Sequence, residues 1–186
     1  MTAMVTPFGK DGNVDYELLK KLIDHLLSTG TDGILVSGTT GEGPTLTEEE
    51  KIELIEKTVE YVAGRVPVVA GTGSNNTKAT IEYTNKVAKI DGVDAALVVV
   101  PYYNKPDQAG MIAHFTAVAD NVDLPIVMYN IPGRTGVTME VKTIAELSKH
   151  QNIIGIKDCT GIVNMAEIVA NTPDDFLAFT GEDADA

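Results

Sequence analysis

A lysine stands where an apolar run gives way to a turn. Residues 153–156 read Ile-Ile-Gly-Ile and lead directly to Lys157, and a Thr-Gly pair follows at 160–161. An apolar run without alternating polar residues is typical of a strand covered on both faces, as in the parallel sheets of α/β proteins. A lysine beside apolar walls loses hydration, which favours the neutral amine, and a neutral amine attacks carbonyl carbons. Lys157 could therefore form a Schiff base, although a lysine that reaches solvent or pairs with Asp158 or Glu182 would give the same pattern.

Three further groups at the ends of other apolar runs could assist such chemistry. Tyr129 ends one run, and its phenol could move protons at the carbon bound to the lysine nitrogen. Thr39 and Thr40 lie between glycines, where hydroxyl and backbone N–H groups can bind a carboxylate. Arg134 lies in a loop after Pro-Gly, and its planar guanidinium matches a carboxylate. Taken singly, each has an ordinary structural explanation: a packed tyrosine, a tight turn before a helix, and a surface ion pair.

These residues need elements that hold them, and the chain alternates short apolar runs with amphipathic stretches. Strands are expected at residues 2–6, 33–37, 67–70, 95–101, 125–129, 153–157 and 176–180. Helices are expected at about 18–27, 47–63, 77–89, 108–121, 138–149 and 164–170, with a capping box at the start of the second and Thr138 as the cap of the fifth. Seven strands and six helices without a composition break predict one α/β domain over residues 1–186.

The glycine-rich turns decide between an open sheet and a closed barrel. Those at 38–43 and 71–76 match neither the dinucleotide nor the P-loop pattern, whereas polar or glycine-rich residues at most strand ends are typical of a (β/α)8 TIM barrel. A barrel has eight strands and about 250 residues, so we expect this domain to be C-terminally incomplete, without its last βα unit and C-terminal helices. Its mouth would gather Thr6, Thr39, Thr40, Tyr103, Tyr129, Arg134, Lys157 and Gly181.

Composition narrows the possible partners and the compartment. The chain has 27 acidic and 14 basic residues, a net charge of −13 that disfavours nucleic acid and anionic membrane surfaces. One cysteine, Cys159, excludes an internal disulfide and favours a reducing, cytoplasmic location, and we expect it to be a small buried filler. The first residues show no basic stretch followed by a long apolar one, and no later window approaches 18 apolar residues, so we expect neither a signal peptide nor a membrane span. His25, His114 and His150 have no metal-ligand spacing and are expected at the surface.

Four motifs, in order, resemble the dihydrodipicolinate synthase family of pyruvate-dependent Schiff-base lyases. They are Gly-Thr-Thr-Gly-Glu at 38–42, Pro-Tyr-Tyr-Asn at 101–104, Tyr-Asn-Ile-Pro-Gly-Arg-Thr-Gly at 129–136 and Gly-Ile-Lys-Asp at 155–158. The match runs through essentially the whole chain. It implies condensation of pyruvate with L-aspartate 4-semialdehyde to 4-hydroxy-tetrahydrodipicolinate, in lysine and diaminopimelate biosynthesis. It also implies no metal or other cofactor, and a homotetramer built as a dimer of dimers at full length.

The resemblance assigns a role to each proton-handling residue. Lys157 would form the Schiff base with pyruvate, and Tyr129 would donate and accept protons. Thr39 would pass protons between Tyr129 and Tyr103, with Tyr103 reaching into the site of a neighbouring subunit. These four residues are the expected catalytic group.

Substrate binding is expected from Thr40, Arg134 and Gly181. The resemblance implies that Thr40 holds the pyruvate carboxylate and that Arg134 holds the carboxylate of the semialdehyde. The sibling N-acetylneuraminate lyases and keto-deoxy-sugar-acid aldolases share the lysine, the tyrosine and the barrel, but typically have Ser-Thr at 39–40 and lack the arginine. Arg134 therefore favours a small aldehyde with a carboxylate. A further alternative is a non-catalytic, truncated remnant that keeps the motifs by descent.

Several members of the family are inhibited by lysine in a cleft between subunits lined by histidine and glutamate. Glu48, Lys51 and Ala79 stand at the corresponding positions. Lys51 would repel a cationic ligand, so the sequence predicts weak or absent feedback by lysine.

Overall fold

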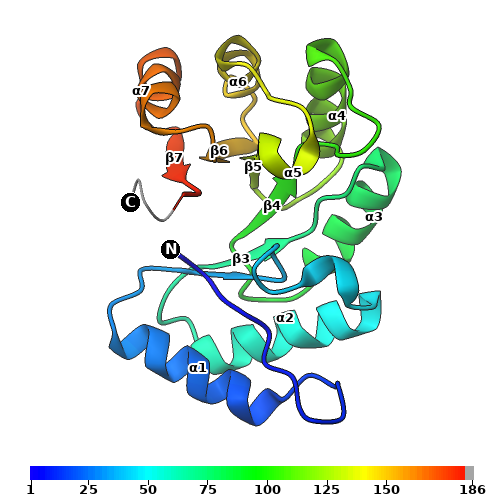
Figure 1. Ribbon diagram of the computed structural model, residues 1–186, viewed down its shortest axis with the longest axis vertical. Helices are drawn as coiled ribbons and strands as arrows, with labels where there is room; N and C mark the ends of the chain where they lie inside the picture. The colour runs from blue at the N-terminus through cyan, green and yellow to red at the C-terminus, as the bar shows by residue number, and fades with distance from the viewer. Residues whose placement is uncertain (183–186) are drawn as a thin grey trace. The chain divides into compact units, whose positions relative to one another are not determined.

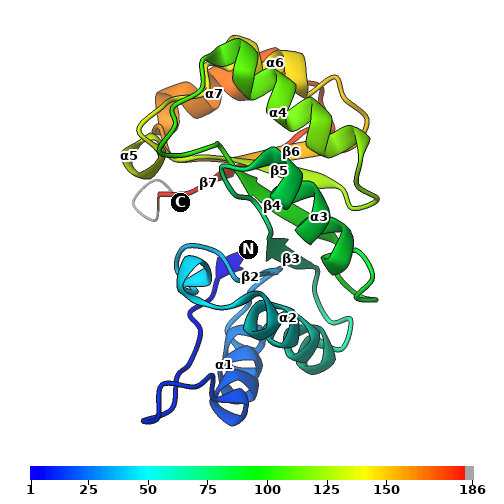
Figure 2. The same ribbon diagram turned by 90° about the vertical axis from the view of Figure 1, so that its right-hand side faces the viewer.

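The computed structural model describes residues 1–182, which divide into two compact units (Figure 1 and Figure 2). Unit 1 consists of Met1–Thr72 and Lys86–Ala96, and unit 2 consists of Gly73–Asn85 and the described residues from Leu97 onward. Residues 1–182 contain seven strands, six helices of seven or more residues and two shorter helical turns. The predicted alternation of seven strands with six helices is therefore confirmed, while a single domain over 1–186 stays a prediction. No helix in this part of the chain is both long and apolar enough to span a membrane.

Unit 1 is a small parallel sheet with two long helices. Its elements are β1 (Thr2–Ala3), α1 (Tyr16–Ser28), β2 (Ile34–Val36), the 3-10 turn η1 (Gly43–Thr45), α2 (Glu48–Val62) and β3 (Val68–Gly71). β2 pairs in parallel with β1 and with β3. All three residues of β2 are buried, as its unbroken apolar run predicts. The predicted capping box is confirmed at the start of α2, where Thr47 Oγ1 accepts from the Glu50 amide and Glu50 Oε2 accepts from the Thr47 amide.

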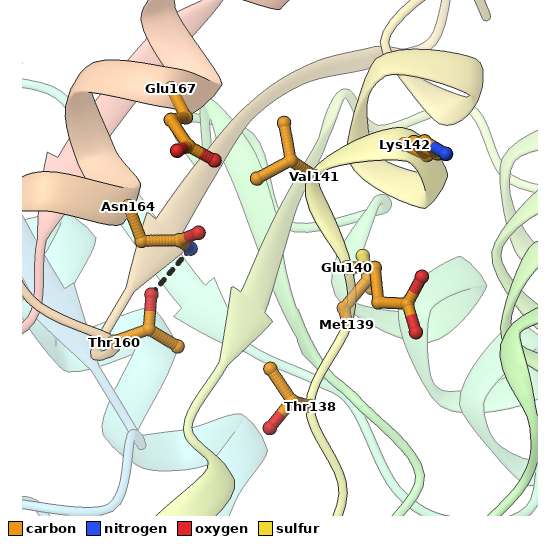
Figure 3. Close-up of a pocket in the computed structure, with 8 residues that line it drawn as sticks. All are labelled: Thr138, Met139, Glu140, Val141, Lys142, Thr160, Asn164 and Glu167. Atoms are coloured by element: carbon orange, nitrogen blue, oxygen red, sulfur yellow. Dashed lines mark hydrogen bonds between the residues drawn. The ribbon is translucent and has the colours of Figure 1, made fainter.

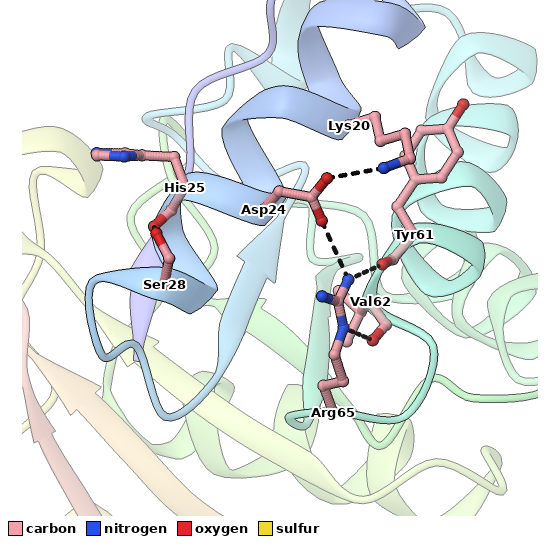
Figure 4. Close-up of polar contacts among 7 residues, drawn as sticks. All are labelled: Lys20, Asp24, His25, Ser28, Tyr61, Val62 and Arg65. Atoms are coloured by element: carbon pink, nitrogen blue, oxygen red, sulfur yellow. Dashed lines mark hydrogen bonds and ion pairs between the residues drawn. The ribbon is translucent and has the colours of Figure 1, made fainter.

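An arginine just beyond α2 joins the two helices of this unit (Figure 4). Arg65 Nε donates to the Val62 carbonyl over 2.8 Å, and Nη2 donates to the Tyr61 carbonyl. The same guanidinium lies 3.3 Å from Asp24 on α1, which also pairs with Lys20 at 2.7 Å. The arginine thus satisfies carbonyls left open at a helix end, while its exposed ion pair contributes little stability.

Unit 2 holds most of α3 (Thr77–Val87) and β4 (Ala95–Val99), and all the elements that follow. These are α4 (Gln108–Asp120), β5 (Ile126–Asn130), α5 (Pro132–Thr135), α6 (Val141–Leu147), β6 (Ile153–Asp158), α7 (Ile162–Asn171) and β7 (Leu177–Thr180). β6 pairs in parallel with β5 on one side and with β7 on the other. α6 lies between α4 and α7, and these helices cover one face of the strands (Figure 1 and Figure 2).

Two local predictions are wrong, and one short helix was not predicted. Thr138 does not cap the helix that follows; α6 begins at Val141, with Glu140 at the N-cap position and no side-chain cap. The four-residue helix α5 was not predicted, because one helical turn is too short to show a periodicity. His114 is buried, with 5% of its surface exposed, because it shares the inner face of α4 with Met111 and Phe115. These three residues recur at the spacing of one helix face, and this pattern in the sequence could have predicted the burial.

Candidate functional site

The predicted lysine and tyrosine lie side by side at the ends of neighbouring strands. Tyr129 on β5 is in register with Lys157 on β6, so the two side chains project from the same face of the sheet. Lys157 Nζ lies 4.9 Å from the centre of the Tyr129 ring. Tyr129 is 6% exposed, whereas Lys157 is partly exposed. An amine that a substrate can reach is thus held against a buried phenol.

Asp158 is not the partner of this lysine. It follows Lys157 directly on an extended strand, so its side chain projects from the opposite face. Its two carboxylate oxygens accept hydrogen bonds from Asn130 and Thr160. The ion-pair explanation of Lys157 through Asp158 is therefore wrong.

Gly181 and Cys159 complete the surroundings of the lysine. A Cβ on Gly181 would lie 3.1 Å from Lys157 Cε and would collide with Cys159 Sγ, so only glycine leaves room for both side chains. Cys159 is two residues beyond Lys157 and is close enough to hydrogen-bond with Tyr129. Burial raises the pKa of the Cys159 thiol above its ordinary value, and the charge of Lys157 partly opposes this. The expectation that Cys159 is a buried filler is wrong, because the residue is only half-buried.

Arg134 and Tyr103 lie on two exposed loops of the same unit. Arg134 is exposed on α5, and Tyr103 is 89% exposed with a left-handed backbone, φ 71°. The two loops are in contact, because a Cβ placed on Gly136 would lie only 3.0 Å from Lys105 Cε. The structure thus brings together Lys157, Tyr129 and Gly181, and places Arg134 and Tyr103 on adjoining loops that face solvent.

Thr39 and Thr40 belong to unit 1, where they form an exposed turn after β2. Glu42 N donates to the Thr39 carbonyl over 3.1 Å, which closes the turn. Thr6, also predicted at the site, is buried and holds the turn through a 2.6 Å hydrogen bond from its hydroxyl to the Gly41 carbonyl. Both hydroxyls of the Thr-Thr pair are therefore presented on a turn that is tied to its own unit.

Close backbone packing fixes the base of this turn. Ser37, at the end of β2, has a left-handed backbone with φ 56° and is buried. A Cβ on Gly43 or on Gly71 would collide with the Ser37 carbonyl oxygen. The glycines are therefore needed for close approach of three backbone segments.

A separate pocket of about 420 Å³ lies between α6 and α7 (Figure 3). It is lined by Thr138, Met139, Glu140, Val141, Lys142, Thr160, Asn164 and Glu167. Asn164 and Glu167 on α7 face Val141, while Lys142 points away. Within residues 1–182, no group of three or more histidine, cysteine, aspartate or glutamate side chains could hold a metal ion.

Repeated βα units with parallel strands, and a lysine and a tyrosine in register at two strand ends, define a protein of the (β/α) barrel class. The sequence model of the Dihydrodipicolinate synthetase family matches residues 1–186. The chain belongs to this family, and the resemblance stated from its motifs is confirmed.

Individual relatives agree with this assignment. The chain is 67% identical over 186 residues to a 4-hydroxy-tetrahydrodipicolinate synthase of Ligilactobacillus salivarius, covering all of this chain and 64% of that protein. The crystal structure of a dihydrodipicolinate synthase from Bacillus anthracis matches with a TM-score of 0.94 at 50% identity, over 97% of this chain and 62% of that one. A pyruvate complex of the synthase from Acinetobacter baumannii matches with a TM-score of 0.93 at 42% identity, over 97% and 62%. The predicted fold class is thereby confirmed, and the chain spans somewhat less than two thirds of these relatives.

Proposed function

We propose that this protein is a lyase that condenses pyruvate with L-aspartate 4-semialdehyde to give 4-hydroxy-tetrahydrodipicolinate. The observation that carries the proposal is the register of Lys157 and Tyr129, with the lysine nitrogen 4.9 Å from the tyrosine ring. The names of the relatives support it, because the synthase from Ligilactobacillus salivarius is 67% identical to this chain. On this proposal the protein acts in lysine and diaminopimelate biosynthesis. Its single cysteine suits the reducing cytoplasm.

The chemistry begins with attack of the Lys157 amine on the keto carbon of pyruvate. Loss of water gives an iminium, which withdraws electrons from the neighbouring methyl group. Loss of a methyl proton then gives an enamine, whose carbon attacks the aldehyde carbon of the second substrate. Tyr129, held beside the lysine, is the group we assign to the proton transfers at each step.

The remaining residues receive roles that suit their positions. We assign Thr39 to a proton relay with Tyr103, and Thr40 to the pyruvate carboxylate, because their turn presents both hydroxyls. Arg134 is exposed and is assigned to the carboxylate of the semialdehyde. Gly181 is assigned to the substrate site because it lies against the lysine, where a larger residue would displace the Lys157 and Cys159 side chains.

We further propose a homotetramer at full length, with Tyr103 completing the site of a neighbouring subunit. Its 89% exposure supports this, because a tyrosine side chain is seldom left almost fully in water. Light scattering would give the mass of the assembly, and Tyr103→Ala would lower the rate of the reaction without preventing Schiff-base formation.

Reductive trapping tests the proposal directly. The protein is incubated with pyruvate and borohydride, and we expect a mass gain of one carboxyethyl group on Lys157. Lys157→Ala should abolish the gain, whereas Lys149→Ala, which removes a surface partner of Glu146, should retain it. Tyr129→Phe should slow trapping on the order of 100-fold. Folded protein that keeps its original mass would refute the proposal and favour a non-catalytic remnant.

Arg134 separates this reaction from those of the sibling aldolases. Arg134→Ala should raise the concentration of aspartate semialdehyde needed for turnover, while pyruvate trapping continues at its original rate. Loss of trapping in this variant, or turnover of a sugar acid in preference to the semialdehyde by the original protein, would contradict the substrate assignment.

A further inference from the structure

A buried polar network lies on the opposite face of the sheet from Lys157 and Tyr129. Asn130 and Asp158 follow the tyrosine and the lysine directly and form the next pair in register. Both side chains are buried, at 0% and 1% exposure, and Asn130 Nδ2 donates to Asp158 Oδ1 over 2.7 Å. Burying a carboxylate costs free energy unless several hydrogen bonds satisfy it. The donors around Asp158 must therefore stay in place for the carboxylate to remain buried.

Asn130 also closes the loop that carries Arg134. Its Oδ1 accepts from the Met139 amide over 3.0 Å, and its Nδ2 donates to the Met139 carbonyl over 3.2 Å. One side chain thus binds both backbone groups of Met139 and joins the two ends of the loop 131–138. The side-chain amide of Asn130 therefore links the end of β5 to the end of β6 and to the residue that follows this loop.

Thr160 satisfies the other oxygen of Asp158. The Thr160 amide donates to Asp158 Oδ2 over 2.9 Å, and the Thr160 hydroxyl donates to the same oxygen. Asn164 Nδ2 on α7 donates to the Thr160 hydroxyl over 2.6 Å, and this bond lies in the wall of the pocket between α6 and α7 (Figure 3). The network therefore runs from the start of α7 to the end of β5.

We propose that Asn130, Asp158 and Thr160, which we call the strand-end network, are positioning residues for the reaction of Lys157 and Tyr129. The inference rests on the proposed function. Neighbouring residues on a strand project to opposite faces, so fixing Asn130 and Asp158 on one face fixes the backbone from which the tyrosine and the lysine project on the other. A displacement of about 1 Å between reacting groups can cost 100-fold in rate.

Thr160→Val tests the network without touching the lysine or the tyrosine. The substitution keeps the shape of the side chain and the backbone bond to Asp158, and removes the hydroxyl. Thr160→Ser restores the hydroxyl. Asn152→Ala is the matched control, because Asn152 also lies in unit 2 just before β6 and its amide holds three backbone carbonyls, those of Ala119, Val122 and Leu124.

Two measurements are made on each variant. The first is the rate of pyruvate trapping on Lys157. The second is hydrogen exchange of the Met139 amide, relative to that of Ile156 inside β6, which needs no substrate. We expect Thr160→Val to slow trapping and to speed Met139 exchange, each on the order of 10-fold. Thr160→Ser should return both to within about twofold of the original values, and Asn152→Ala should lower the free energy of unfolding without slowing trapping.

The outcomes separate the network from the proposed function. If the original protein traps no pyruvate, the proposed function fails, and unchanged Met139 exchange in Thr160→Val would overturn the network as well. If trapping occurs but Thr160→Val leaves its rate unchanged, the positioning role is wrong. Equal slowing by Asn152→Ala would also overturn it, because general destabilisation would then explain the effect.

Discussion

The buried histidine of α4 makes the stability of this protein depend on pH. His114 Nδ1 shares a 2.8 Å hydrogen bond with Thr77 Oγ1, and its Nε2 is buried with no hydrogen-bond partner among the described residues. Protonation would charge the ring and leave a buried N–H without an acceptor. Burial accordingly lowers the pKa of His114 from 6.5 to about 4.

The sign and size of the effect follow from this difference. Between pH 6.5 and about 4 the unfolded chain binds a proton on this imidazole that the folded chain does not bind, so the free energy of unfolding falls as the pH falls. Above pH 6.5 the ring is neutral in both states and its contribution is constant. Each pH unit between the two pKa values changes the free energy of unfolding by about 1.4 kcal/mol, so the loss amounts to roughly 3 kcal/mol by pH 4. This is a large part of the stability of an ordinary domain.

Urea unfolding of the original protein and of His114→Phe, at several pH values from 7.5 to 4, measures this contribution. Phenylalanine keeps an aromatic ring beside Phe115, against which the imidazole packs edge to face, and it cannot titrate. Relative to the original protein, the variant should gain roughly 3 kcal/mol on going from pH 7 to pH 4. Ile144→Val, a change at a buried position on α6, should cost about 1 kcal/mol at every pH.

Parallel curves for the original protein and His114→Phe would refute the reasoning, since the ring would then titrate equally in the folded and unfolded chains. A steeper loss of stability in the variant at low pH would also contradict it, because the sign would be reversed.

Three other measurements address separate features. Thr47→Ala removes the N-cap of α2 and should lower the free energy of unfolding by about 1 kcal/mol, whereas Thr47→Ser should retain it; equal losses would contradict the capping role. Gly71→Ala forces a Cβ against the Ser37 carbonyl and should cost roughly 1–3 kcal/mol in the same assay, so a neutral result would show that the backbone can move apart. The pKa of the Cys159 thiol is raised by burial, so alkylation by iodoacetamide should reach its half-maximal rate at a higher pH in the folded protein than in urea. As the chain has one cysteine, its mass reports this site alone, and an equal or lower pH in the folded state would contradict the expected shift.

Local sequence patterns were sufficient to predict the order of the strands and helices and to identify Lys157 as the candidate nucleophile. The apolar run before Lys157 and the spacing of Thr47 and Glu50 are properties of a few consecutive residues, and β6 and the capping box were found where those residues indicate. The beginning of α6 and the turn α5 were missed, because loop geometry depends on contacts such as the closure of the 131–138 loop by Asn130.

The amino-acid sequence by itself determined the βα alternation, the family and the residues able to do the chemistry, because periodicity and motifs are local. Only the tertiary structure decided which of those residues meet. The pairing of Lys157 with Tyr129 depends on the register between two strands separated by more than twenty residues, and the neighbouring Asn130–Asp158 pair depends on the same register. The helical spacing of its face could have indicated the burial of His114, but only packing between helices decided that Thr77 on α3 lies beside its ring.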